Sequence, residues 1–274
     1  MLERETAEAA RIARQAGEIL MAVYATDFRV AYKAEADPVT DADTQANAYI
    51  VHELRKAFPG DGIVAEETED WSDALEGGRC WYVDPLDGAK EFVARNGEFS
   101  VMLGLAIDGV ATAGVVYRPD NDKLYAGVVG DGAYLEERGV RRALGVSTVA
   151  DPADLKLVVS RSHRNRAVGE VVTRLGIKQE TTSGSVGLKA GLIAEGKVDL
   201  YVHIADKSSM WDACGPEAVL KAAGGRFTDL AGNPYRYGGA DMRNRNGILA
   251  CNAAAYDAVL PVAREAAMAA GLID

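Results

Sequence analysis

The chain is 274 residues long, which fits one large domain or two closely packed ones and excludes a long multidomain assembly. Its 41 acidic and 30 basic side chains give a net charge of −11, which would repel a polyphosphate backbone and argues against general nucleic-acid binding. Hydrophobic residues make up 48% of the chain and charged residues 26%, a composition typical of a globular protein with a substantial core.

The cysteines and the N-terminal residues bear on the cellular compartment. Cys80, Cys214 and Cys251 are odd in number and lack CxxC spacing, which argues against a disulfide framework and a structural zinc site. Residues 1–25 carry charges among alanines instead of the apolar stretch of a signal peptide, and no apolar run is long enough to span a bilayer. We therefore expect a cytoplasmic protein that does not associate with membranes.

Residues 1–150 are expected to form two helices and a largely antiparallel sheet. Apolar residues recur every three or four positions over 9–23, which predicts an amphipathic helix, and a second helix is predicted from Asp41 to Ala57, ended by Pro59-Gly60. Turn residues separate most of the β-branched runs that follow, which favours hairpins. These runs lie at 63–65, 81–83, 100–107, 112–117, 124–129 and 133–135.

Residues 151–274 alternate between strand and helix patterns, which favours an α/β arrangement. The predicted strands cover 157–159, 199–202, 226–228 and 248–251. The predicted helices cover 167–175, 188–194 and 217–223, followed by a terminal helix opened by Asn252. No repeat or Pro/Ser-rich linker separates the two halves, so we expect 1–150 and 151–274 to pack as one rigid unit.

Two carboxylates emerge where an apolar strand runs into an Asp-Pro-Leu-Asp-Gly turn. The strand brings Asp84 to a defined position, and Asp87 can face the same point from across the turn. The amides of Gly88 and Ala89 would be free donors at a helix start, suited to an anion. Carboxylates beside such donors favour an intervening Mg²⁺, although the pentapeptide alone fits an ordinary surface turn equally well.

Acids at two further positions strengthen the metal interpretation. Glu66-Glu67 follows the strand at 63–65, and Asp212 precedes a Gly-Pro pair expected to lead into the helix from Glu217. Taken singly, an acidic pair is usually a solvated surface and a Trp-Asp pair usually caps a helix. Together with Asp84 and Asp87, these acids predict a metal cluster.

Four segments together resemble the signature segments of the inositol monophosphatase superfamily. They are Asp37 to Asp43, Glu66-Glu67, Asp84 to Gly88 and Trp211 to Gly215, in the right order and over essentially the whole chain. The resemblance implies an αβαβα layered sandwich, a homodimer, and magnesium-dependent, lithium-sensitive hydrolysis of small phosphate monoesters.

The same resemblance implies roles for individual residues. Glu66, Asp84 and the Leu86 carbonyl would hold one Mg²⁺, a second would be held by Asp84, Asp87 and Asp212, and Glu66 would touch a weaker third ion. Water activated between the ions would be the nucleophile. The residues expected to bind the substrate are Asp87, Gly88, Ala89, Gly184, Ser185, Lys207 and Asp212.

The chain departs from the family pattern at Ala89. The family has a threonine there, whose hydroxyl acts with the aspartate matching Asp43 to orient or deprotonate the attacking water. Alanine keeps the amide but removes the hydroxyl, a loss that typically costs on the order of 10²-fold in rate. Either Glu66 and metal-bound hydroxide suffice, or the chain is a slow enzyme, a binding-only relative or a protein in which position 89 has been altered.

Within the superfamily, residues 90–99, 160–163 and 194–197 are most similar to the bacterial bisphosphate nucleotidase branch, which removes the 3′-phosphate of adenosine 3′,5′-bisphosphate. Inositol monophosphatases usually have a glutamate at the position of Ala205, which weighs against the alternative of an inositol or sugar phosphatase. Lys207 suits a second phosphate, or is a solvated surface residue. His163, His203 and Cys214 are interpreted as structural or surface residues.

Overall fold

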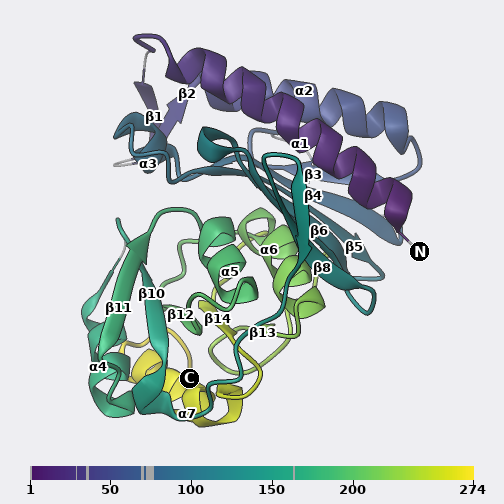
Figure 1. Ribbon diagram of the computed structural model, residues 1–274. Coiled ribbons are helices and arrows are strands. Elements are labelled where there is room, and N and C mark those ends of the chain that lie inside the picture. The colour runs from purple at the N-terminus through teal and green to yellow at the C-terminus, as the bar shows by residue number, and fades with distance from the viewer. Residues whose placement is uncertain (1, 29, 35–36, 69–70, 72–76, 163) are drawn as a thin grey trace.

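The computed structural model (Figure 1) describes residues 2–28, 30–34, 37–68, 71, 77–162 and 164–274. Five layers alternate between helices and sheets, so the predicted αβαβα sandwich is confirmed. One outer layer consists of α1 (Glu3–Tyr24) and α2 (Asp41–Ala57), the middle layer of α5 (Val186–Ala194) and α6 (Met210–Ala222), and the other outer layer of α4 (Arg166–Leu175) and α7 (Tyr256–Ala269).

A seven-stranded sheet lies between the first two helical layers. Its strands, in spatial order, are β3 (Gly62–Ala65), β4 (Arg79–Asp87), β5 (Ser100–Ile107), β6 (Val110–Arg118), β7 (Lys123–Val128), β8 (Gly132–Glu137) and β9 (Val140–Ala143). β3 and β4 are parallel and the other neighbours are antiparallel, so the sheet is largely antiparallel, as predicted. The sequence did not predict β9, whose four side chains are all exposed and show no apolar alternation.

A five-stranded sheet lies between the middle helices and the α4–α7 layer. Its spatial order is β11 (Gln179–Ser183), β10 (Lys156–Ser160), β12 (Leu200–His203), β14 (Ile248–Cys251) and β13 (Arg226–Thr228). β10 pairs in parallel with both β11 and β12, and the remaining pairs are antiparallel. The other strands were predicted, but β11 was missed because it has no apolar residue.

The remaining elements are short connecting segments. β1 (Val30–Ala34) and β2 (Asp37–Thr40) form an antiparallel pair, where the sequence predicted neither strand. α3 (Ala89–Val93) is the helix expected after the Asp-Gly pair, and it contacts β2. η2 (Pro119–Asn121) and η3 (Pro152–Asp154) are each a single turn of 3₁₀ helix.

Helix α6 begins at Met210, seven residues before the predicted start. The Gly-Pro pair that was expected to precede the helix lies inside it, because Gly215 is where the helix backbone approaches the large sheet. A Cβ on Gly104 of β5 would lie 2.4 Å from Gly215 N, and a Cβ on Gly114 of β6 would lie 2.2 Å from Gly215 O. Glycines on both sides of the contact therefore bring the N-terminal half of α6 close to the sheet.

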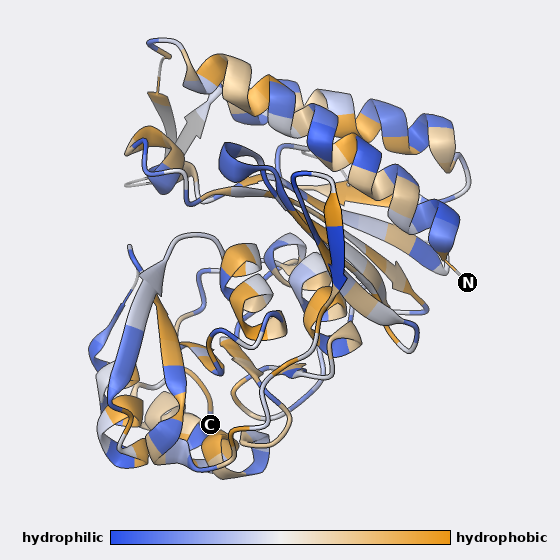
Figure 2. Ribbon diagram, in the orientation of Figure 1, coloured by the Kyte–Doolittle hydropathy of each residue, from blue (hydrophilic) through white to orange (hydrophobic). Residues whose placement is uncertain are grey.

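Hydrophobic residues fill the spaces between the layers. In Figure 2, α5 between the two sheets is largely hydrophobic, whereas α1 carries hydrophilic residues along its length and buries one stripe against the large sheet.

All strands of the large sheet precede residue 144, but α5 and α6 from the second half pack against it, so the halves share one layer. In the part of the chain that the structure describes, no helix combines the length and hydropathy of a membrane span.

Candidate active site

The predicted acidic residues converge where β3, β4 and the N-terminal turn of α6 meet. In the parallel pairing of β3 with β4, Ala65 lies opposite Val83, and the next amide along, Glu66 N–H, donates to the Val83 carbonyl at 3.1 Å. Glu66 is thereby held beside Asp84 of β4. Asp212 lies in the first turn of α6, and its charge interacts with those of Asp87 and Glu66.

Strand β4 does not stop at the Asp-Pro pair as predicted but continues to Asp87. Its register with β5 shifts on the way, because Asp84 pairs with Met102 while Asp87 pairs with Ser100. From one pair to the next, β4 therefore advances by three residues while β5 advances by two. The extra residue in β4 forms a β-bulge. Side chains three apart on a regular strand point to opposite faces, so the bulge is what lets Asp84 and Asp87 face the same point.

Burial and mutual repulsion dominate the electrostatics of the acids. Burial raises the pKa of Asp84 well above its ordinary value, and the charges of Glu66, Asp87 and Asp212 raise it further. The pKa of Asp212 is likewise raised by burial and by Asp87 and Glu66. Burial also raises the pKa of Asp87, although Lys189 opposes the shift. Such a group of buried acids is stable in its ionised form only beside compensating positive charge.

Hydrogen bonds from the surrounding residues orient these carboxylates. Leu86 N donates to Asp84 Oδ1 at 2.9 Å, and Ser209 N donates to Asp212 Oδ2 at 2.7 Å in a capping box at the start of α6. Ser185 donates from Oγ to Asp87 Oδ2 at 2.5 Å. Each aspartate therefore has a fixed orientation, which is the role that outer partners have around metal ligands.

The donor set fits a divalent cation with hard oxygen ligands. Among the described residues, no group of three or more His, Cys, Asp or Glu side chains has the geometry of a preformed metal cage. Mg²⁺ does not require one, because it retains several waters and binds through a few carboxylates together with substrate oxygens. The carboxylates of Glu66, Asp84, Asp87 and Asp212 and the nearby Leu86 carbonyl match that chemistry.

Lys189 is a site residue that the sequence analysis missed. It is fully buried on α5, where its Nζ donates to the Ser185 carbonyl at 2.5 Å and lies 4.9 Å from the centroid of the Tyr201 ring. Burial lowers the pKa of Lys189 to about 8, and the neighbouring charges of Asp87 and Asp212 oppose that shift. The signal was a single lysine in an otherwise uncharged, apolar helix, a position that a solvated lysine rarely occupies.

Gly184 and Ser185 lie at the start of α5, next to Asp87. Ser185 has a φ of +56°, which is unusual for a residue with a side chain, and its Oγ also accepts from Leu188 N at 3.1 Å as the cap of α5. A Cβ on Gly184 would lie 2.4 Å from the Glu98 carbonyl oxygen, so only glycine fits there. The predicted substrate residues Gly184 and Ser185 of the second half therefore lie beside Asp87 of the first half.

Asp43 and Ala89 lie on α2 and α3, two helices that both contact β2. Asp43 is buried in the first turn of α2, where its Oδ2 accepts from Thr40 N at 2.8 Å and Thr40 Oγ1 at 2.7 Å. Burial raises the pKa of Asp43 to about 6. Ala89 begins α3 after Gly88, whose φ of +101° requires glycine, and α3 packs against β2, which ends at Thr40.

Other predicted residues do not join the acid cluster. Lys207 is exposed, so its contact with a second phosphate stays a prediction. His203 ends β12 with its ring centroid 6.4 Å from that of Tyr201, and His163 lies outside the described residues. Cys214 is a fully buried free thiol whose pKa is raised by burial, in agreement with a packing role.

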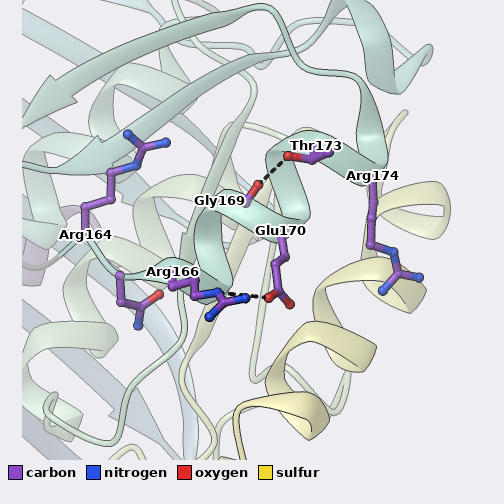
Figure 3. A pocket seen from close by; sticks show the side chains of 7 residues that line it. Arg164, Arg166, Gly169, Glu170, Thr173 and Arg174 are labelled. Atoms are coloured by element: carbon purple, nitrogen blue, oxygen red, sulfur yellow. Dashed lines mark hydrogen bonds and ion pairs between the residues drawn. The ribbon is translucent and has the colours of Figure 1, made fainter.

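A shallow hollow of about 640 Å³ on α4 contains none of the predicted site residues (Figure 3). Its charged side chains are paired: Arg164 with Glu180 at 2.9 Å, Arg166 with Glu170 at 3.7 Å, and Arg174 with Glu265. The lining residues are Arg164, Asn165, Arg166, Gly169, Glu170, Thr173 and Arg174. Because these arginines already have carboxylate partners, the acid cluster is the stronger candidate for the active site.

Comparison with known proteins gives a consistent result. The model of the inositol monophosphatase family matches residues 1–268. The 3′(2′),5′-bisphosphate nucleotidase CysQ of Escherichia coli O157:H7 is 39% identical over 230 residues, covering 83% of this chain and 91% of that protein. The crystal structure of CysQ from Bacteroides thetaiotaomicron is 30% identical with a TM-score of 0.76, covering 92% of this chain and 98% of that one. The inositol monophosphatase from Anabaena is 27% identical with a TM-score of 0.77, covering 96% of each chain.

Proposed function

The chain belongs to the inositol monophosphatase family, and from this premise we propose that it uses Mg²⁺ to hydrolyse the 3′-phosphate of adenosine 3′,5′-bisphosphate. Whichever substrate it uses, the chain is a phosphomonoester hydrolase that acts on a small phosphorylated molecule. The observation that carries the proposal is the convergence of four acids, three of them aspartates whose pKa values are raised by burial.

The acids would hold the metal ions. Asp84 would be shared between two ions, with Glu66 and the Leu86 carbonyl completing one set and Asp87 and Asp212 the other. Bound Mg²⁺ would supply positive charge to the phosphate oxygens and lower the pKa of a bound water. Oriented carboxylates from three separate elements would therefore place the ions at a point that no single element defines.

The backbone beside Asp87 would hold the scissile phosphate. The amides of Gly88 and Ala89 open α3, and Gly184 and Ser185 approach Asp87 from the other half of the chain. Asp43, with a pKa of about 6, suits a proton acceptor near neutral pH. Because Ala89 has no hydroxyl to link Asp43 with the water, we expect proton removal to be slower than in relatives with threonine there.

The choice of a bisphosphate substrate is supported by similarity to bisphosphate nucleotidases and by an additional positive charge. Lys189 is buried beside Asp87 and Asp212, so its ammonium would act in a medium of low dielectric constant. That charge would favour a substrate more anionic than a monophosphate. An inositol phosphate is the second candidate, supported by the similar fold of the Anabaena enzyme but opposed by Ala205.

A phosphate-release assay tests the proposal. Adenosine 3′,5′-bisphosphate, inositol 1-phosphate and fructose 1,6-bisphosphate are compared at equal concentration, with Mg²⁺ and with EDTA. We expect Mg²⁺-dependent release and the highest kcat/KM for the nucleotide. Preference for inositol phosphate would assign the second candidate, and release unaffected by EDTA would contradict the metal role. The expected homodimer is tested separately by sedimentation equilibrium.

A further inference from the structure

Glu98 joins the two halves of the candidate active site. It lies between α3 and β5, and its carboxylate accepts from Arg161 Nε and Nη2, each at 2.7 Å, and from Gly184 N at 2.8 Å. Although desolvation opposes the shift, the bonds from Arg161 and Gly184 hold the pKa of Glu98 below its ordinary value. The carboxylate is therefore ionised at neutral pH, and charge-assisted bonds of this kind are the stronger class.

The backbone of Glu98 contacts the two glycines expected to hold phosphate. A Cβ on Gly88 would lie 3.0 Å from the Glu98 carbonyl oxygen, and a Cβ on Gly184 would lie 2.4 Å from the same atom. One residue therefore lies between the turn that follows Asp87 and the turn that precedes α5. Displacing Glu98 would move both turns.

Ser185 has a conformation that needs external support. Its φ of +56° and ψ of +131° fall outside the favoured regions for a residue with a Cβ, and such backbone conformations persist only where neighbouring contacts hold them. Glu98 holds the preceding amide, Gly184 N, and Lys189 holds the Ser185 carbonyl. The result is that Ser185 Oγ reaches Asp87 Oδ2 at 2.5 Å.

We propose that Glu98 is a positioning residue that fixes Ser185 against Asp87 and thereby sets the affinity of the acid cluster for Mg²⁺. The inference rests on the proposed function, because it takes Asp87 as a metal ligand. Glu98 would act through two intermediates: its carboxylate holds Gly184 N, and the neighbouring Ser185 hydroxyl then holds one oxygen of Asp87. Outer partners of this type typically change metal affinity about 10- to 100-fold when removed.

Variants of Glu98 separate hydrogen-bond geometry from charge. Glutamine has the same length and can keep an oxygen at the position of Oε2, which accepts from both Gly184 N and Arg161 Nε, although its amide nitrogen replaces Oε1 and loses the bond from Arg161 Nη2. Aspartate keeps the charge but is too short to hold Gly184 and Arg161 together. We therefore expect Glu98→Gln to bind Mg²⁺ within about threefold of the wild type, and Glu98→Asp and Glu98→Ala to bind it about 10- to 100-fold more weakly.

The matched control is a second Arg–Glu pair in the same half of the chain as Arg161. Glu180 pairs with Arg164 at 2.9 Å, with similar exposure, and it lies on β11 away from the acid cluster. Mg²⁺ affinity is measured by isothermal calorimetry on each folded full-length variant, with thermal denaturation to compare stability. Glu180→Ala should lower the melting temperature less than Glu98→Ala, because the Glu180 carboxylate pairs with Arg164 whereas that of Glu98 also accepts from a backbone amide, and it should leave Mg²⁺ affinity unchanged.

The outcomes distinguish failure of this inference from failure of the proposed function. A wild-type protein without measurable Mg²⁺ binding would contradict the proposed function itself. If the wild type binds Mg²⁺ and Glu98→Asp and Glu98→Ala bind it equally well, the positioning role is overturned and the metal site stands. Equal weakening in Glu98→Gln and Glu98→Ala would also overturn it, because charge rather than the bond to Gly184 would then control affinity.

Discussion

The Ser185 hydroxyl donates a hydrogen bond to Asp87 Oδ2 at 2.5 Å, linking residues 98 positions apart in the sequence. Asp87 ends β4 in the large sheet, whereas Ser185 precedes α5 in the middle layer. The acidic site is therefore completed only when the second half of the chain packs against the first. Orientation of Asp87 depends on that packing as much as on its own strand.

Replacing Ser185 should weaken Mg²⁺ binding more than replacing Ser100, whose hydroxyl lies next to that of Ser185. Ser185→Ala removes the donor to Asp87, so we expect Mg²⁺ affinity to fall about 10- to 100-fold. Ser100→Ala is the control, because Ser100 Oγ lies 2.9 Å from Ser185 Oγ and reaches the acids through that hydroxyl. Calorimetric titration of both variants checks the difference. Equal losses would mean that the Ser100–Ser185 contact, and not the bond to Asp87, controls affinity.

Removing one buried acid should stabilise the metal-free protein while impairing metal binding. Asp84 is repelled by Glu66, Asp87 and Asp212, and an asparagine in its place would keep an oxygen for the Leu86 amide. In EDTA we expect Asp84→Asn to melt above the wild type, by about 2–4 °C for each kcal/mol of relieved repulsion. In Mg²⁺ the wild type should gain stability and the variant should not.

Thermal denaturation with and without Mg²⁺ measures both effects. Asp27→Asn is the control, because Asp27 is exposed and far along the chain from the acids. An Asp84→Asn protein that is less stable in EDTA and still stabilised by Mg²⁺ would remove Asp84 from the metal site.

The acidic site could be predicted from the sequence because each acid follows a local strand or helix signal. What could not be predicted is how the chain brings those signals together. The bulge that turns Asp84 and Asp87 to one face appears only in the register with β5. The true start of α6 was hidden because Gly215 and Pro216 resemble a helix opening, whereas Gly215 serves the close contact with Gly104.

Residues whose role depends on distant partners were the ones missed. The charges that act on Lys189 are those of Asp87, Glu91, Glu98 and Asp212, and none of these residues is near it in sequence. β11 carries no apolar side chain and is a strand because it pairs with β10. Local patterns hold no information about either relationship.

The two lysines considered for a second phosphate should differ in their effect on substrate binding. An ammonium in a buried site interacts more strongly with an anion than an exposed, screened one. We expect Lys189→Met to weaken bisphosphate binding by roughly 1.5–3 kcal/mol, about 10- to 100-fold in KM, with a smaller effect of Lys207→Ala. Steady-state kinetics with bisphosphate and monophosphate substrates, and circular dichroism to verify folding, check this. A larger, bisphosphate-selective loss in Lys207→Ala would favour the sequence-based assignment.

Burial of Asp43 should make part of the protein's stability depend on pH. The pKa of Asp43 is about 6 in the folded state against an ordinary value of 3.8. Ionisation of Asp43 therefore lowers the free energy of unfolding; this destabilisation is fully present above pH 6 and disappears as the pH falls below 3.8. A difference of about two pKa units corresponds to about 3 kcal/mol. Asp43→Asn lacks this cost. The unfolding free energy of the variant minus that of the wild type should therefore be largest at about pH 7.5 and about 1 kcal/mol smaller at about pH 5. Urea unfolding at both pH values measures the change, and a pH-independent difference would contradict it.

The most informative substitution is Ala89→Thr. Ala89 opens α3, which packs against the strand that ends at Thr40, and Thr40 is hydrogen-bonded to Asp43. A threonine hydroxyl at position 89 would restore the link between Asp43 and the attacking water, an interaction made in the transition state and not with bound substrate. We therefore expect kcat to rise about 10²-fold with little change in KM.

The double variant Ala89→Thr with Asp43→Asn tests whether the new hydroxyl acts through Asp43. Because the two side chains would act as a unit, the gain from threonine should disappear when Asp43 cannot accept a proton, and the two effects should not be additive. Steady-state rates at saturating Mg²⁺ for the wild type, both single variants and the double variant measure this coupling. If Ala89→Thr leaves kcat unchanged, the water is activated through Glu66 and the metal alone. Asp43 would then serve only as the partner of Thr40 in the capping box that begins α2.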